Sequence, residues 1–141
     1  MADSELRRNR VLLKTDLAAD LPPVLADRIQ LQQVLLNLML NGMEAMLAVT
    51  DRARELIIRS QKEETEAIRV AVQDAGVGVA LQDLERIFTA FLTTKPEGLG
   101  MGLAISRSII EAHGGRLWAT PNVGPGLTVQ FTLPTSDEGE P

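Results

Sequence analysis

The chain has 141 residues, of which 45% are hydrophobic and 23% charged, and it carries a net charge of −5 and no cysteine. This length suits a single domain with a hydrophobic core. The composition excludes a disordered or fibrous chain and a disulfide framework, and the absence of a basic tract argues against nucleic acid as a partner.

No segment of the sequence is predicted to enter a membrane. The longest apolar stretch runs from Val34 to Met39, far short of the ~20 residues that a membrane helix needs. The first five residues lack the basic start and apolar run of a secretory signal. We therefore expect a cytoplasmic location.

In chain order, apolar and β-branched runs separated by turn residues predict five strands and three helices. The predicted strands are Arg10–Asp16, Glu55–Ser60, Ala67–Gln73, Arg116–Thr120 and Leu127–Leu133. The predicted helices are Arg28–Val49, with Asp27 as N-cap, Leu81–Ile87 and Met101–His113. The charged residues 62–66 are expected to form the solvated tip of a hairpin.

This order of elements predicts an α/β fold, a two-layer sandwich in which a mixed sheet of about five strands packs against three helices. The domain is expected to span residues 10–134. Residues 135–141 are polar and acidic, and they are expected to form a disordered tail.

A narrow polar stripe runs along the long predicted helix and comprises Gln30, Gln33, Asn37, Asn41 and Glu44. The rest of this helix is apolar, which predicts burial, and a buried amide without a partner costs roughly 1–3 kcal/mol. A solvated stripe is more often built from Lys and Glu than from Asn, which is a poor helix former. The helix alone leaves a solvated stripe and a binding site equally open.

Three glycine motifs follow. Asp74–Gly78 (Asp-Ala-Gly-Val-Gly) places a carboxylate at a strand end, and alone it is weak evidence for a site. In Gly98–Leu103, three alternate glycines lead into a helix, so that backbone N–H groups can approach a phosphate. This motif is neither a P-loop nor a dinucleotide fingerprint. Gly124–Thr128 is a turn that enters a strand, and by itself it indicates only structure.

Taken in order, five motifs resemble the N, G1, F, G2 and G3 boxes of the catalytic ATP-binding domain of sensor histidine kinases, in the GHKL superfamily. They are Asn37–Asn41, Asp74–Gly78, Phe88–Lys95, Gly98–Leu103 and Gly124–Thr128. The resemblance covers Val11–Leu133. It implies a mixed sheet under three helices and a mobile lid over ATP.

The resemblance also implies roles for individual residues. Asn37 and Asn41 are the implied catalytic residues, with Asn41 ligating Mg²⁺ and Asn37 lying near the phosphates. Asp74 accepts the exocyclic amino group of adenine, so that GTP is rejected. The residues implied to bind ATP are Asn37, Asn41, Asp74, Gly76, Gly78, Lys95, Gly98, Leu99, Gly100, Met101, Gly102, Leu103 and Thr128.

Two of these roles stay open. Lys95 either contacts phosphate or is a solvated loop lysine, and Glu44 stands where many members of the family carry a lysine. The glycines from Gly98 to Gly102 are expected to act as the hinge of the lid. The Thr128 hydroxyl is expected near the adenine.

The function implied by the resemblance is transfer of the γ-phosphoryl group of Mg-ATP to a histidine on a separate dimerisation domain of the same kinase, from which a response regulator receives it. His113, the only histidine, is expected to cap its helix rather than to accept phosphate. Residues 1–9 are then a linker from the missing dimerisation domain, and the fragment is expected to be monomeric.

Two alternatives belong to other classes of function. The first is an ATPase switch of the gyrase or chaperone kind, in which a glutamate at the position of Asn37 activates water. Asn37 cannot act as a base, so slow hydrolysis is expected. The second is a regulatory nucleotide-binding module without transferase activity.

Overall fold

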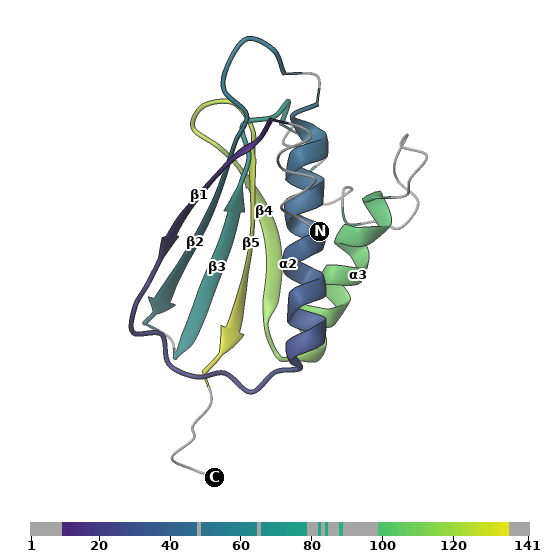
Figure 1. Ribbon diagram of the computed structural model, residues 1–141. Coiled ribbons are helices and arrows are strands. Elements are labelled where there is room, and N and C mark those ends of the chain that lie inside the picture. The colour runs from purple at the N-terminus through teal and green to yellow at the C-terminus, as the bar shows by residue number, and fades with distance from the viewer. Residues whose placement is uncertain are drawn as a thin grey trace.

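The computed structural model describes residues 10–47, 49–64, 66–78, 82, 84, 88 and 99–135. In this part of the chain, the strands are β1 (Leu12–Leu17), β2 (Glu55–Glu63), β3 (Ala67–Gln73), β4 (Arg116–Pro121) and β5 (Leu127–Pro134), and the helices are α2 (Arg28–Ala45) and α3 (Leu99–Ala112). The strands form one twisted sheet, and both helices pack against the same face of it (Figure 1). Neither helix is long and apolar enough to cross a membrane.

The sheet is mixed. Its strand order is β1-β2-β3-β5-β4. β1 runs parallel to β2, while every other neighbouring pair is antiparallel. The predicted fold class, a two-layer α/β sandwich with a five-stranded mixed sheet, is confirmed. The third predicted helix, Leu81–Ile87, falls almost entirely outside the described residues, as do residues 1–9 and most of the tail.

The core lies between the sheet and the two helices. β3 and β5 alternate between core and open-face positions, because successive side chains of a strand point to opposite faces. The fully or nearly fully buried residues of this layer include Val34 and Leu38 of α2, Ile110 of α3, Leu56 of β2, Leu117 of β4 and Leu133 of β5.

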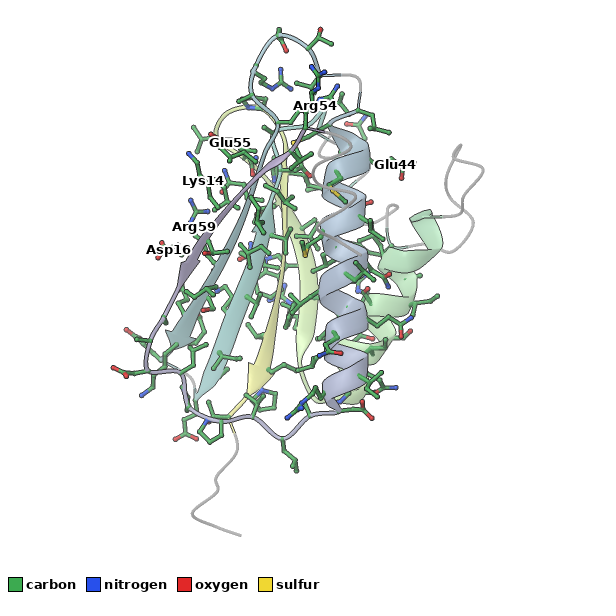
Figure 2. The ribbon with its side chains drawn as sticks, viewed as in Figure 1. Lys14, Asp16, Glu44, Arg54, Glu55 and Arg59 are labelled. Carbon is green, nitrogen blue, oxygen red and sulfur yellow. The ribbon has the colours of Figure 1, made fainter. Side chains whose placement is uncertain are left out.

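The open face of the sheet carries polar side chains that bond to one another. On β2 and β3, Arg59 donates to the Gln73 side-chain oxygen at 2.6 Å. At the β1–β2 edge, Lys14 forms an ion pair with Glu55 at 3.0 Å. Lys14, Asp16 and Arg59 lie along this edge of the sheet (Figure 2). This face is therefore structured by side-chain pairs rather than by a covering layer in the described part of the chain.

α2 begins where the sequence predicts. The Asp27 side chain accepts a hydrogen bond from the Gln30 N–H at 3.0 Å, which is the expected N-cap interaction. The other end differs, because the helix stops at Ala45 and not at Val49. The Met46 N–H bonds to the Met43 carbonyl at 3.1 Å, a spacing of three residues that tightens and ends the helix.

The segment after α2 is held by an arginine. Arg54 donates to the main-chain carbonyls of Val49 at 3.1 Å and Leu47 at 2.9 Å. These bonds satisfy carbonyl groups just beyond the helix end, where intrahelical partners are missing. Tertiary contacts therefore set this boundary, and the periodicity of the sequence does not report them.

Other boundaries shift by a few residues. β1 begins two residues late, at Leu12, whose N–H bonds to the Arg54 carbonyl at 2.8 Å. β2 continues to Glu63 instead of ending at Ser60, so part of the charged segment 62–66 belongs to the sheet. The reason is that Glu63 is held across the hairpin by Arg69, with contacts of 2.9 and 3.0 Å.

His113 joins the end of α3 to the start of α2. Its Nε2 accepts a hydrogen bond from the Asp27 N–H at 3.1 Å, and its Nδ1 lies 2.8 Å from the Ile109 carbonyl oxygen. With Nε2 accepting this bond, Nδ1 is available to donate to the Ile109 carbonyl. The expected cap at this helix end is therefore present.

Candidate functional site

The site is built around Asp74, the first residue after β3. Its side chain is only 4% exposed. One carboxylate oxygen, Oδ1, accepts the N–H of Gly76 at 2.8 Å and the N–H of Leu127 at 3.2 Å. These two bonds fix the orientation of the carboxylate and leave the other oxygen, Oδ2, outside both of them.

Burial raises the pKa of the Asp74 carboxyl above its usual range. The two backbone N–H groups lower this pKa and offset the rise only in part. Burial and two backbone N–H groups, rather than an arginine or a lysine, thus set the pKa of this carboxyl. A buried carboxyl with a raised pKa is typical of a functional site.

Gly42 of α2 allows the helix to approach Asp74. A Cβ atom at residue 42 would lie 2.7 Å from Leu56 Cδ1, 3.3 Å from Asp74 Cβ and 3.7 Å from Asp74 Oδ2. A side chain at residue 42 therefore requires Leu56 and Asp74 to shift. We did not single out Gly42 from the sequence, although a glycine inside a helix costs about 1 kcal/mol relative to alanine and so signals a packing requirement.

The glycine turn after Asp74 lies on the end of α2. A Cβ at Gly76 would come within 2.5 Å of the Ala45 carbonyl oxygen, and the Val77 N–H bonds to that same oxygen at 3.3 Å. Gly78 has a positive φ of 77°, which favours glycine. Both glycines predicted as site residues are therefore required by the backbone around Asp74.

Arg52 holds this turn from outside. It donates from Nε to the Ala75 carbonyl at 2.9 Å and from Nη2 to the Gly76 carbonyl at 2.8 Å. The interaction fixes the main chain that orients the Asp74 carboxylate. No sequence pattern pointed to Arg52, because its two partners are main-chain carbonyls more than 20 residues away.

Of the two asparagines of α2, Asn37 contacts α3. Its side-chain N–H donates to the Ser106 hydroxyl at 3.2 Å, and Ser106 is fully buried. Asn41 lies one turn further along α2 and directly precedes Gly42. Both asparagines are partly buried. The polar stripe of α2 therefore runs between α3 and the Asp74 end of the sheet at these two positions.

The first turn of α3 comprises residues 99–102, which include the predicted site residues Leu99, Gly100, Met101 and Gly102. A helix N-terminus presents N–H groups that favour an anion. Leu103, also a predicted site residue, is 3% exposed and belongs to the core cluster. Lys95 and Gly98 lie outside the described residues.

Thr128 lies apart from the Asp74 carboxylate. It is paired in register with Gln73 and Thr120 on the open face of the sheet, whereas its neighbour Leu127 is buried in the core. Its hydroxyl donates to Asn122 Oδ1 at 2.5 Å. The structure does not bring this hydroxyl to the helical side of the sheet, where the Asp74 carboxylate meets Gly42.

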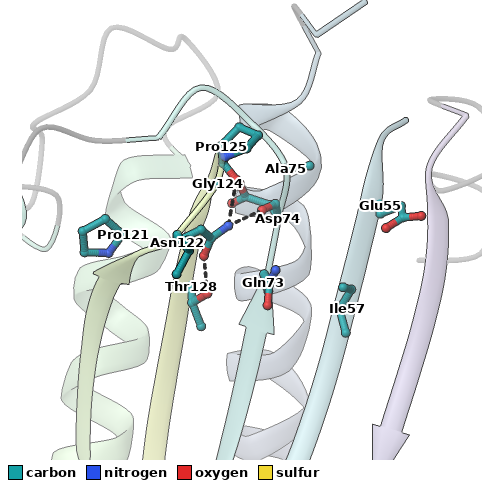
Figure 3. A pocket seen from close by; sticks show the side chains of 11 residues that line it. Glu55, Ile57, Gln73, Asp74, Ala75, Pro121, Asn122, Gly124, Pro125 and Thr128 are labelled. Atoms are coloured by element: carbon teal, nitrogen blue, oxygen red, sulfur yellow. Dashed lines mark hydrogen bonds between the residues drawn. The ribbon is translucent and has the colours of Figure 1, made fainter. Parts of the chain in front are cut away.

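Asn122 links Thr128 to the main chain of Asp74. Its side-chain amide donates to the Asp74 carbonyl at 2.8 Å and to the Pro125 carbonyl at 2.9 Å. These residues line a pocket of about 440 Å³ on the open face (Figure 3). Asn122 was not predicted from the sequence, and its side chain fixes both the turn before β5 and the backbone of Asp74.

The described residues contain no group of three or more His, Asp or Glu side chains that could hold a metal ion. Mg²⁺ binds hard oxygen ligands and commonly completes its coordination with water and phosphate oxygens, so that it needs few protein ligands. The side-chain oxygen of Asn41 is a suitable ligand of this kind.

The fold and the site together define a two-layer α/β domain with a buried acceptor at the end of its central strands, beside the helical layer. Residues 26–137 match the family of histidine kinase-, DNA gyrase B- and HSP90-like ATPases. The chain belongs to this family, which confirms the resemblance seen in its motifs. The family assignment supports nucleotide binding.

Named relatives are sensor kinases. The sensor protein FixL of Bradyrhizobium diazoefficiens is 46% identical over 132 residues, which are 94% of this chain and 26% of FixL. The nucleotide-free catalytic domain of the histidine kinase ThkA has a TM-score of 0.81 and 33% identity, covering 96% of this chain and 86% of that domain.

Two further solved structures contain a ligand or a partner. Full-length ShkA in complex with AMPPNP has a TM-score of 0.81 and 28% identity, covering 94% of this chain and 27% of ShkA. ThkA in complex with the response regulator TrrA has a TM-score of 0.77 and 32% identity, covering 96% of this chain and 37% of that chain. The chain thus spans about a quarter of the length of FixL and of ShkA.

Proposed function

We propose that this domain binds Mg-ATP and delivers its γ-phosphoryl group to a histidine on a separate dimerisation domain, as part of two-component signalling. The observation that carries the proposal is the Asp74 carboxylate, which is buried, held by two backbone N–H groups through Oδ1, and close to α2 at Gly42. Membership of the ATPase family supports the nucleotide as the ligand.

Asp74 reads the base in this proposal. Its Oδ2 accepts the exocyclic amino group of adenine, while Gly76 and Gly78 let the backbone approach the ring. Guanine presents a carbonyl oxygen at the same position, so that two acceptors face each other and GTP is rejected. The role proposed for Thr128 differs from direct contact with adenine. Its hydroxyl bonds to the Asn122 side chain, which in turn donates to the Asp74 main-chain carbonyl and so helps to position Asp74.

Asn41 and Asn37 serve the phosphate end. Asn41 holds Mg²⁺ through its side-chain oxygen, and Asn37 positions α2 against α3 through Ser106. When bound, Mg²⁺ neutralises charge on the phosphate oxygens, which is the main requirement of phosphoryl transfer. The glycines 98, 100 and 102 and Lys95 complete the triphosphate site, with residues 99–102 supplying backbone N–H groups at the start of α3.

The partners follow from the proposed reaction. The acceptor histidine lies on a dimerisation domain of the same full-length kinase, and a response regulator then takes the phosphoryl group. A solved complex of the relative ThkA with the response regulator TrrA supports this order of partners. We place the domain, residues 10–134, in the cytoplasm with its ATP.

An ATPase switch is the less favoured function. Asn37 has no group that can accept a proton from water, and its side-chain N–H is already donated to Ser106. Hydrolysis by the isolated domain is therefore expected to be far slower than the ~10 s⁻¹ that is typical of enzymes.

The direct test is to mix the chain with the dimerisation domain of a sensor kinase and γ-labelled ATP. Label that is stable to base and labile to acid on the dimerisation domain supports transfer to histidine. The Asn41→Ala variant is expected to lose this label. The matched control is Gln33→Ala, since Gln33 is exposed on the same stripe of α2.

Each other outcome has a definite meaning. If the Asn41→Ala variant labels the dimerisation domain as strongly as the wild-type chain does, Asn41 is not the magnesium ligand. Nucleotide binding without any transfer to several dimerisation domains favours the regulatory module. Rapid release of labelled phosphate by the chain alone favours the ATPase switch.

A further inference from the structure

β1 is an edge strand whose side chains are all exposed. It pairs only with β2 in the described chain and lies at the outer edge of the sheet (Figure 1). Leu12, Leu13 and Leu17 are 54%, 37% and 59% exposed. An edge strand presents unpaired backbone N–H and C=O groups that can bond to another strand. Such an edge promotes aggregation unless it is covered or pairs with a specific partner.

The backbone bonds of β1 show which of its groups point outward. The Leu12 N–H donates to the carbonyl of Arg54, the residue before β2, at 2.8 Å, and the N–H of Ala18, just after β1, donates to the carbonyl of Ser60 in β2 at 3.3 Å. Because successive residues of a strand point their N–H and C=O groups to opposite sides, even-numbered residues face β2. The N–H and C=O groups of Leu13, Thr15 and Leu17 therefore face the outer edge.

We propose that this edge pairs with the β1 strand of a second copy of the chain. The two strands run antiparallel about a twofold axis at Thr15. Leu13 then lies opposite Leu17 of the second copy, and Lys14 lies opposite Asp16 of the second copy. All outward backbone groups of these residues meet in hydrogen-bonded pairs, about six bonds in all.

The sequence of β1 selects this register. The outward residues can also meet in registers shifted by two residues in either direction. One shift places Lys14 opposite Lys14 of the second copy, and the other places Asp16 opposite Asp16, and like charges directly opposite are destabilising. Of these registers, only the one centred on Thr15 places Lys14 opposite Asp16 of the second copy. The same register places Leu13 opposite Leu17.

The charges next to β1 extend the same pattern. Lys14 forms its ion pair with Glu55, and Asp16 is the register partner of Arg59. All four side chains lie at this edge (Figure 2). Across the paired edge, the charges alternate in sign. Glu55 and Lys14 of one copy are followed by Asp16 and Arg59 of the second copy. This row stabilises the pairing and is sensitive to salt.

A strand pairing of this length buries less surface than the ~1,200 Å² of a standard interface. Association of the isolated chain is therefore weak and appears only at high protein concentration. The proposal departs from the expectation that the fragment is monomeric. The inference does not depend on nucleotide binding.

The test uses two charge variants. Lys14→Asp makes the strand acidic at both positions, and Asp16→Lys makes it basic at both, so each variant opposes like charges when it pairs with itself. In sedimentation equilibrium at rising concentration, the wild-type chain is expected to form dimers. Each variant alone is expected to dimerise at least about tenfold more weakly, since opposed charges replace two ion pairs.

An equimolar mixture of the two variants is expected to restore association, because each acidic strand then faces a basic one. High salt should weaken this mixed dimer more than the wild-type dimer. Thr15→Pro provides a check that does not change charge. It removes an N–H group that faces outward, so it should abolish the dimer while leaving the pairing of β1 with β2 intact.

The far-ultraviolet circular dichroism and thermal unfolding of each variant show whether the monomer is folded. The proposal is overturned if the wild-type chain stays monomeric up to millimolar concentration. It is also overturned if the mixed variants fail to associate, or if a dimer forms that neither the charge variants nor Thr15→Pro weakens.

Discussion

Asp74 and Glu63 are two carboxylates at opposite ends of the central hairpin, and their surroundings differ. Glu63 lies on the open face, where Arg69 donates to both of its oxygens and lowers the pKa of its carboxyl. Asp74 lies on the core side, where burial raises the pKa of its carboxyl and its partners are backbone N–H groups. The first carboxylate is neutralised by a cation, and the second is not.

The difference distinguishes a carboxylate paired within the fold from one proposed to bind a ligand. On the open face, polar groups satisfy each other, as in the bonds of Gln130 with Arg69 at 3.2 Å and with Thr120 at 3.1 Å. Asp74 instead has two backbone N–H partners, both on Oδ1, and burial disfavours its charged form. This environment is consistent with the role in ligand binding proposed for Asp74.

The largest expected effect comes from removing this acceptor. Asn at position 74 can still accept both backbone N–H groups, but it presents an NH₂ group where Oδ2 stood. Asp74→Asn should therefore weaken ATP binding by at least about 100-fold, because two donors then face each other. Isothermal titration calorimetry measures this, and wild-type affinity in the folded variant would contradict the role of Asp74.

The same variant changes the pH dependence of stability. Because the folded pKa of Asp74 is raised, its contribution is fully present below the unfolded pKa of ~3.9 and is lost as pH rises through the folded pKa. The wild-type protein should thus lose stability relative to Asp74→Asn as the pH rises above about 4. Urea unfolding at a series of pH values tests the sign.

A smaller effect is expected from Gly42→Ala. The added methyl group meets Leu56 at 2.7 Å and Asp74 at 3.3 Å, so that the helix must move away from the carboxylate. ATP affinity should fall by roughly tenfold, and the gain in helix propensity of about 1 kcal/mol should be outweighed by overpacking. Gly124→Ala is the matched control, because a Cβ at that glycine meets nothing within 4 Å. Equal losses in both variants would exclude a specific role for Gly42.

Arg52→Ala should act on the turn that orients Asp74. Loss of two charge-assisted bonds to carbonyls is expected to destabilise the fold by about 1–3 kcal/mol and to weaken ATP binding several-fold. Arg54→Ala is the comparison, since Arg54 bonds to the Val49 and Leu47 carbonyls just beyond the end of α2. The ratio of ATP to GTP affinity should fall for Arg52→Ala alone, and an unchanged ratio would make Arg52 purely structural.

Glu63→Gln should have the smallest effect and the opposite pH dependence. Because the folded pKa of Glu63 is lowered, its contribution is present above the unfolded value of ~4.3 and is lost as pH falls through the folded pKa. The variant should be less stable than wild type at neutral pH and equal to it in strong acid, with ATP affinity unchanged. A change in affinity would show that the two faces of the sheet are coupled.

Much of the fold could be predicted from the sequence, because alternation in β3 and β5 and the N-cap at Asp27 are local signals. The end of α2 could not. Its apolar periodicity continues past Ala45, while the chain is turned there by main-chain bonds and by Arg54. The extension of β2 to Glu63 likewise depends on Arg69 across the hairpin.

The site residues stay predictions from the motifs, whereas the residues that hold the turn after Asp74 were found only in the structure. Asp74 and Gly76 could be singled out because a carboxylate and glycines at a strand end suggest chemistry. Arg52 and Asn122 act on main-chain carbonyls that are distant in sequence, and such contacts leave no local pattern. The expectation that the Thr128 hydroxyl lies near the adenine rests on the resemblance, which does not report strand parity; in the structure this hydroxyl lies on the open face and bonds to Asn122.

The bond between His113 and the Asp27 N–H fixes one end of α3 to the start of α2. A second side-chain bond between the two helices, from Asn37 to the Ser106 hydroxyl at 3.2 Å, lies near the middle of α3. The two bonds hold α3 against α2 at its C-terminal end and near its middle, so any displacement of α3 relative to α2 requires at least one of them to shift.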